Sequence, residues 1–278
     1  MIRPPLSKAL VATALFAGLA GIMSPAARAI DQTMKIDCEM CDLRYKSYES
    51  DNLVGSVFRG AYLFNVNFAR ADLTNADFES ATLVYAKLTR ADLTDANLTK
   101  ANMSRAAMHG ATLRGAHVQF GDLTEAQLEA AELTFADFTA ANLKAAKLPL
   151  VFADRTRFRS ADLSQSVLED ADLRRSDLEG SNLIGADLSG ANLTMANLAN
   201  ASMQGANLTG ADLSYANLQG ANLTGAKLNK ATIFGSNLKE AVFGKADLTG
   251  ATMDSVITDR ADFCDAIMPD GKKGDCKR

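Results

Sequence analysis

The sequence has few of the residues from which catalytic and metal-binding sites are usually built. Among its 278 residues there is no tryptophan, and there are only two histidines, four cysteines and five prolines. It contains no glycine-rich phosphate loop of the required form and no convergent set of Ser, His and Asp. We therefore expect no catalytic residue, no cofactor-binding residue and no metal ligand, and predict that the chain is not an enzyme.

The sequence also lacks an apolar run long enough to span a membrane as a helix. The longest, Ala9–Met23, has about fifteen residues, whereas a membrane-spanning helix needs roughly 20. Arg3 and Lys8 precede it, and Ala27-Arg28-Ala29 follows it, with small residues at the two positions that a signal peptidase inspects. Residues 1–29 are thus predicted to be cleaved, leaving a periplasmic or secreted protein without an integral membrane segment. An uncleaved N-terminal anchor is the less favoured alternative.

Basic residues do not predominate. Lys and Arg number 29 against 33 Asp and Glu, a formal net charge of −4, and loss of residues 1–29 removes three basic and no acidic residues, which gives −7. Nonspecific binding of nucleic acid depends on Lys and Arg that neutralise phosphates. We therefore predict no nucleic-acid partner.

One five-residue phrase is abundant. Residues 186–226 read ADLSGANLTMANLANASMQGANLTGADLSYANLQGANLTGA. The centre of each unit recurs at every fifth position from Leu43 to Met268 and is Leu, Phe, Met, Ile or Val except at Tyr48, Ala153 and Thr258. On an α-helix five residues turn through about 500°, which would scatter the centres around the axis. On a straight strand an odd repeat would switch faces at each step. The chain must therefore turn a corner every five residues, with a small residue and, two positions later, a large one directed inward.

The phrase A(D/N)LXX, as in ADLTN, ANLTG and ADLSG, resembles the motif of the pentapeptide-repeat family over nearly the whole chain after residue 29. The resemblance implies an all-β fold, a right-handed quadrilateral parallel β-helix (a solenoid) with four units per coil. The roughly 46 units would then form about 11 coils, which at roughly 4.8 Å per coil make a rod on the order of 50 Å long.

Departures from the motif suggest the domain boundaries. The predicted domains are the signal peptide at 1–29, an N-terminal cap with a CxxC motif at 30–55, the β-helix at 56–263, and a C-terminal cap at 264–278. Within the β-helix, the segment Pro149–Arg157 departs furthest from the motif, since Val151 and Ala153 stand where Ala and Leu belong. It is predicted to form either a bulged coil or a small loop.

Four cysteines in an exported chain indicate disulfides. Cys38 and Cys41 have the spacing of a redox motif or of half a zinc site, but no βαβ pattern surrounds them. Cys264 and Cys276 would sit at the other end of the rod, which excludes a zinc site made of all four. The predicted pairs are Cys38 with Cys41, and Cys264 with Cys276, the second closing the C-terminal cap.

With four units per coil, residues 20 apart lie above one another. Tyr62, Phe64, Val84 and Tyr85 then form an exposed apolar cluster near the N-terminal end, and such clusters often mark contact sites. We predict that this cluster binds a protein partner. The alternative is that residues 30–50 fold over it. Other apolar residues are predicted to point outward more singly: Phe120, Phe135, Phe152, Met195, Tyr215 and Phe234.

The same spacing applies to the densest basic segment. Opposite charges stack beside three of its arginines, and the expected pairs are Arg157 with Asp137 and Asp177, Arg159 with Glu179, and Arg174 with Asp154. Only Arg155 and Arg175 lack an opposite charge directly above or below, so these two are a candidate anion-binding corner. The alternative is a solvated ladder of exposed pairs, each worth at most about 1 kcal/mol. The two histidines, His109 and His117, fall on opposite walls and cannot share a metal or a proton.

Two functions follow from these features. The favoured one is a non-enzymatic exported scaffold that binds an unidentified protein through a face or an end of the rod, with a homo-oligomer left open. The alternative is an acidic rod that mimics DNA and binds a topoisomerase, as resemblance to the gyrase-protecting members of the family implies.

Overall fold

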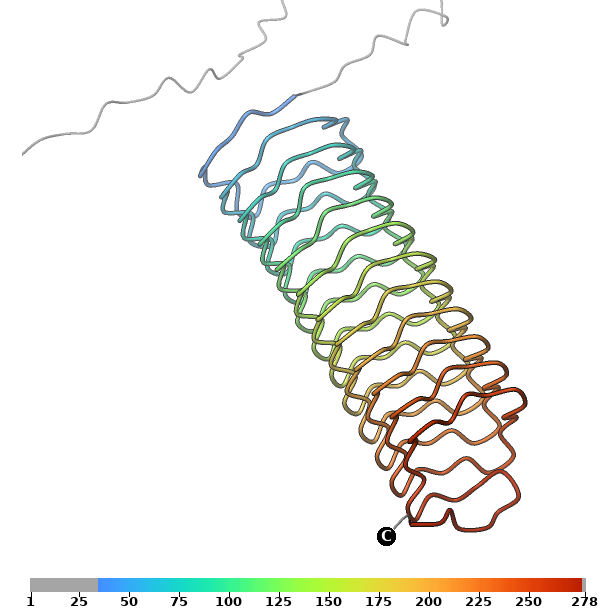
Figure 1. Cartoon of the computed structure of the whole chain (residues 1–278). Coiled ribbons are helices and arrows are strands. Elements are labelled where there is room, and N and C mark those ends of the chain that lie inside the picture. The colour runs from blue at the N-terminus through green and yellow to red at the C-terminus, as the bar shows by residue number, and fades with distance from the viewer. Residues whose placement is uncertain (1–34, 277–278) are drawn as a thin grey trace, which may run out of the picture. The chain divides into compact units, whose positions relative to one another are not determined.

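The computed structural model describes residues 35–276. The predicted signal peptide and residues 30–34 lie outside the described residues. The described chain contains no helix and no extended strand, and consists of isolated bridge residues that alternate with tight turns. Figure 1 shows these segments as coils stacked one on another, from the blue N-terminal coil to the red C-terminal coil.

The bridges fix the number of units in each coil. Asp37 bridges Val57 in parallel, Val57 bridges Asp77, and the same step of 20 residues continues to the bridge between Asp247 and Ile267. Each five-residue unit supplies one bridge residue, the residue just before its centre. Four units therefore complete one coil, and the predicted quadrilateral parallel β-helix is confirmed.

A tight turn follows each centre. In the unit of Phe58, the Ala61 N–H donates to the Phe58 carbonyl at 3.0 Å and closes a four-residue turn. The second residue after the centre, which we call the corner position, has a positive φ at every fifth residue from Met40 to Asp265, with values between 50° at Asn65 and 71° at Gly250. This is the left-handed region that glycine adopts without a steric penalty. The corner is therefore the one position where the solenoid strains a non-glycine backbone.

The Asp or Asn of the motif has a structural role at the bridge position. The Asp92 carboxylate accepts hydrogen bonds from the Thr94 N–H at 2.9 Å and the Thr94 hydroxyl at 2.6 Å, and so caps the turn. Asn side chains also link coils, as where the Asn97 amide donates to the Asp77 carboxylate at 3.0 Å. The acceptor oxygen of the side chain reaches the N–H of the second residue along the chain, as that of Glu132 also does at 3.0 Å.

Centres and small inward residues form one continuous core. Leu193 and Ala191 are fully buried, and the rings of Phe58 and Phe78 stack with centroids 4.9 Å apart. Burial of a leucine side chain stabilises the fold by on the order of 2 kcal/mol, so the stack of centres supplies most of the driving force.

The segment Pro149–Arg157 keeps the register, so the prediction of a bulge or a loop is wrong. Pro149 takes the first turn position, which a fixed φ near −65° suits. Val151 and Ala153 are fully buried in the two inward places, and Phe152 bridges Asp172. The buried Thr156 hydroxyl donates to the Leu133 carbonyl at 2.7 Å. A larger and a smaller side chain, Val151 and Ala153, thus exchange the usual sizes of the two inward positions without a change of register.

The solenoid is longer than the predicted boundaries. Bridges begin at Asp37, inside the predicted N-terminal cap, and continue to Ile267, inside the predicted C-terminal cap. The chain then reverses, and Ile267 pairs with Lys273 in an antiparallel bridge. Both predicted disulfides are present, Cys38–Cys41 in the first coil and Cys264–Cys276 in the last.

Candidate protein-binding surface

Three aromatic side chains on neighbouring coils form a column near the N-terminal end. The Tyr45 and Phe64 rings meet edge to face at 5.5 Å, and Phe64 meets Tyr85 in the same way at 5.6 Å. Tyr45 is 69% exposed and Tyr85 42% exposed, whereas Phe64 between them is partly buried. We call Tyr45, Phe64 and Tyr85 the N-terminal aromatic column. Aromatic pairs of this geometry are favourable beyond their buried area, so the column is held in one arrangement.

An arginine fixes the far end of this column. The Arg105 guanidinium donates to the Tyr85 hydroxyl at 2.7 Å and lies 5.8 Å from the centroid of its ring. It also pairs with the Glu125 carboxylate at 2.9 Å, and the hydrogen bonds to Glu125 and Tyr85 raise the pKa of Arg105. The column therefore ends in a permanently charged group that orients the tyrosine ring.

The predicted cluster is only part of this surface. Phe64 and Tyr85 belong to the column, Tyr62 is exposed on the same wall, and Val84 is partly buried. Tyr45 was not predicted, because the segment that contains it was assigned to the cap. Its place at the corner position, 40 residues before Tyr85, is the signal that identifies it.

The N-terminal segment does not fold over the column within the described residues. Residues 35–50 belong to the first coil, in which Asp42 bridges Tyr62 and Ser47 bridges Asn67. The alternative of a covering segment is therefore wrong for residues 35–50, which lengthen the aromatic surface through Tyr45 instead.

In the basic segment between Arg155 and Arg175, Arg174 and Arg175 do not pair as predicted. Arg175 pairs with Asp154 through two hydrogen bonds of 2.8 Å, so Arg175 is not the unpaired corner residue that was predicted. Arg174, expected to reach Asp154, instead binds Asp172 of its own unit at 2.5 Å. That hydrogen bond holds the pKa of the Asp172 carboxyl below its ordinary value. The predicted pairs of Arg157 with Asp137 at 3.6 Å and of Arg159 with Glu179 at 2.7 Å are present.

The histidines do not form a joint site. His109 follows the centre Met108 and its Nε2 lies 2.8 Å from the Gln127 amide oxygen. His117 precedes the centre Val118, two units further along. In a coil of four units this places the two imidazoles on opposite walls, as predicted.

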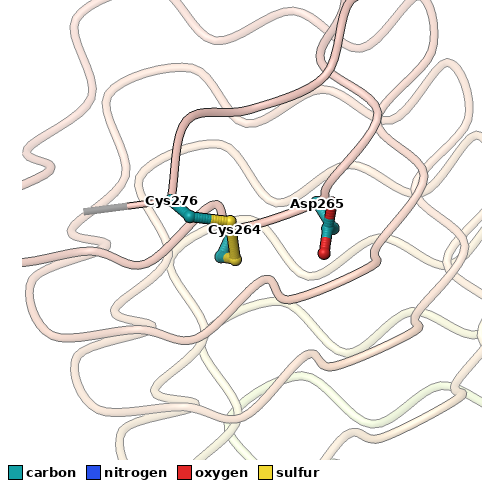
Figure 2. A group of neighbouring side chains, drawn as sticks. All are labelled: Cys264, Asp265 and Cys276. Carbon is teal, nitrogen blue, oxygen red and sulfur yellow. A yellow bond between two sulfur atoms is a disulfide. The ribbon is translucent and has the colours of Figure 1, made fainter. Parts of the chain in front are cut away.

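The C-terminal cystine lies beside a carboxylate. Figure 2 shows Cys264 joined to Cys276, with Asp265 next to them. Sulfur, sulfur and carboxylate oxygen lie within 4.8 Å of one another, but the sulfurs are bonded to each other, and thiolates are what a metal would require. The group is therefore a disulfide that joins the C-terminal segment covalently to the last coil, and we call it the C-terminal clasp.

The solenoid is hollowed beside this clasp. A cavity of about 580 Å³ is lined by apolar side chains, among them Phe263 and Met268, and by Asp270, Lys272 and Lys273. Between residues 35 and 276 the structure contains no helix long and apolar enough to cross a membrane.

Fold and surface together define a β-helical repeat protein that presents side chains in ordered columns. The family model for pentapeptide repeats matches the sequence in 8 copies, over residues 52–79, 76–115, 122–149, 156–194 and 191–229. These matches cover more than half of the chain, so the protein belongs to the pentapeptide-repeat family, and its solenoid is the right-handed quadrilateral β-helix of that family.

Solved structures with a similar chain path include other members of this family. HetL, a pentapeptide repeat protein involved in heterocyst differentiation regulation in the cyanobacterium Nostoc, is 29% identical, with 87% of this chain and 94% of that chain covered and a TM-score of 0.33. A trypsin-treated variant of QnrB1, a plasmid-mediated fluoroquinolone resistance protein, is 20% identical, with 79% and 90% covered and a TM-score of 0.40. No curated protein matches the sequence.

Proposed function

We propose that this protein is a non-enzymatic, exported scaffold that binds another protein through the N-terminal aromatic column. The observation that supports the proposal is the edge-to-face arrangement of Tyr45, Phe64 and Tyr85 on an exposed wall. Aromatic residues dominate the binding energy of many interfaces, and rings that are already ordered lose little entropy on binding. The charged group of Arg105 at the end of the column gives the surface a polar rim.

Photo-cross-linking in the producing cell tests this proposal. A photoreactive residue replaces Phe64, and a control replaces Thr224, which occupies the same turn position on the same wall eight coils away. We expect a discrete protein adduct at position 64 and none at position 224, and we expect Tyr45→Ser and Tyr85→Ser to weaken the adduct. Adducts of equal intensity at both positions, or none at 64, would contradict the proposal.

Export is tested separately. If residues 1–29 are a signal peptide, the protein recovered from the periplasm or the medium begins at Ile30, which N-terminal sequencing shows directly. An uncleaved chain in the cytosol would contradict export and would favour the DNA-mimicking alternative. The carboxylates argue against that alternative, because several are already paired with arginines, as Asp154 is with Arg175. An assay of DNA supercoiling by gyrase with and without the protein separates the two functions.

A further inference from the structure

A second exposed column lies on the wall opposite the N-terminal aromatic column. Its five residues occupy corner positions at steps of 20 and are Phe135, Arg155, Arg175, Met195 and Tyr215. Backbone hydrogen bonds join the corresponding turns from coil to coil, for example from Met195 N–H to the Ser214 carbonyl at 2.9 Å. We call these five residues the mid-rod column. Their units lie two steps from those of Tyr45 and Tyr85 within the coil, which places the columns on opposite walls.

The column has apolar side chains at both ends and two arginines between them. Met195 is 58% exposed and Tyr215 55% exposed, and Phe135 is also exposed at the other end. The apolar residues had been predicted to occur singly, and the structure corrects this by aligning three of them with two arginines. Aromatic residues, Met and Arg are the residue types enriched at the centres of protein interfaces.

Tyr215 is held in place by its neighbours. Its ring meets Phe234 edge to face at 5.4 Å and rests against Gly235 on the next coil. A Cβ at Gly235 would lie 2.8 Å from two ring carbons, so only glycine leaves room for the ring in this position. The exposed tyrosine is thus ordered before any partner arrives, which lowers the entropic cost of binding.

The charges of the column leave one cation without an opposite charge. Arg175 is held by Asp154 at 2.8 Å, and the neighbouring Arg174 by Asp172 at 2.5 Å. The Arg155 guanidinium lies 5.6 Å from the centroid of the Phe135 ring and makes no ion pair or hydrogen bond with any residue in the described range. Both nearby carboxylates are already engaged, so the guanidinium donors of Arg155 are open to a carboxylate from outside the chain.

We infer that the mid-rod column binds a peptide segment of another protein in which Asp or Glu is flanked by apolar side chains. The carboxylate would meet Arg155, and the apolar side chains would cover Met195 and Tyr215. At about 4.8 Å per coil, Arg155 and Tyr215 are roughly 14 Å apart, a distance that four or five extended residues span. A nucleic-acid strand fits less well, because Asp154 and Asp172 place two carboxylates beside the column.

This surface is independent of the proposed function, since it shares no residue with the N-terminal aromatic column. With both columns occupied, the solenoid would hold two partners on opposite walls and act as an adaptor between them.

Peptide selection on the purified protein tests the inference. A random dodecapeptide library displayed on phage is selected against the protein, and the affinities of the enriched peptides are measured in solution. The test variant is Arg155→Gln, and the matched control is Arg90→Gln, an exposed arginine at the same corner position on another wall. We expect enrichment of Asp or Glu beside apolar residues. We also expect a loss of affinity of at least about tenfold for Arg155→Gln and for the Asn or Gln version of the peptide, but not for Arg90→Gln.

Three results would overturn the inference. The first is a selection that yields no acidic peptide, or peptides that bind Arg155→Gln as tightly as the unmodified protein. The second is a concentration-dependent dimer, seen by sedimentation velocity, that Met195→Ser abolishes, since the column would then bind a second copy of the chain. The third is binding of a single-stranded oligonucleotide that depends on Arg155.

Discussion

At the scale of single residues, the positive φ of the corner position leads us to expect that glycine is more stabilising there than other residues. Ala130 is exposed and has a φ of 53°, so its Cβ is strained without packing against the core. We expect Ala130→Gly to stabilise the fold by about 0.5–1 kcal/mol, the reverse of the usual effect. Urea unfolding measures the change. Gly205→Ala, at a corner with open space around the added Cβ, should destabilise by a similar amount, and a gain there would contradict the backbone argument.

A buried serine offers a second residue-scale prediction. Ser181 is fully buried at a small inward position, and its hydroxyl has no hydrogen-bond partner among the described residues. Ser181→Ala should therefore raise the free energy of unfolding by about 1 kcal/mol, because an unsatisfied buried hydroxyl is removed. The control is Ser176→Ala, which removes a hydroxyl that donates to the Leu173 carbonyl at 2.7 Å. Equal effects of the two substitutions on the thermal midpoint would contradict this assignment.

At the scale of one pentapeptide element, the pair of Asp172 and Arg174 couples stability to pH. The hydrogen bond from Arg174 lowers the pKa of Asp172 in the folded state, so the pair stabilises the fold above the unfolded pKa of about 3.9. That contribution is lost as the pH falls through the lowered pKa. We expect Arg174→Gln to raise the pKa of Asp172 in a carbon-13 NMR titration. The variant should be less stable than the parent above about pH 5, with the difference shrinking in acid; a difference that is constant with pH would contradict the pairing.

At the scale of the whole solenoid, each coil contacts only its neighbours, so damage to the core should remain local at first. Leu193 is a fully buried centre, and Leu193→Ala should cost roughly 2.7–5 kcal/mol. Hydrogen exchange measured by mass spectrometry should show faster exchange in the coils around residue 193 and unchanged protection near Phe64. Thr194→Ala, one residue away at a turn position, is the control. Uniform loss of protection along the chain would contradict local coupling.

The period of the sequence predicted the solenoid because a step of five residues leaves the backbone few alternatives. It placed the stacked rows, the centres and both disulfides correctly. It did not predict which acid Arg175 binds, because an arginine side chain reaches a diagonal neighbour on the previous coil as easily as the residue directly along the stack. Nor did it predict that Pro149 would keep the register, since the motif describes preferred residues and not the φ that each position requires. The mid-rod column was missed because Arg155 and Arg175 separate Phe135 from Met195 and Tyr215 along the row.

The step of 20 residues between bridges also makes the relative orientation of the two columns a discrete quantity. Inserting one pentapeptide between Tyr85 and Phe135 would rotate one column by a quarter turn about the axis, and two inserted units would bring both columns to the same wall. Only whole coils, added in multiples of four units, would change their separation and leave their directions intact. Duplication of repeat units during evolution can therefore change the angle between two bound partners in steps of about 90°, while the residues of each binding surface stay the same.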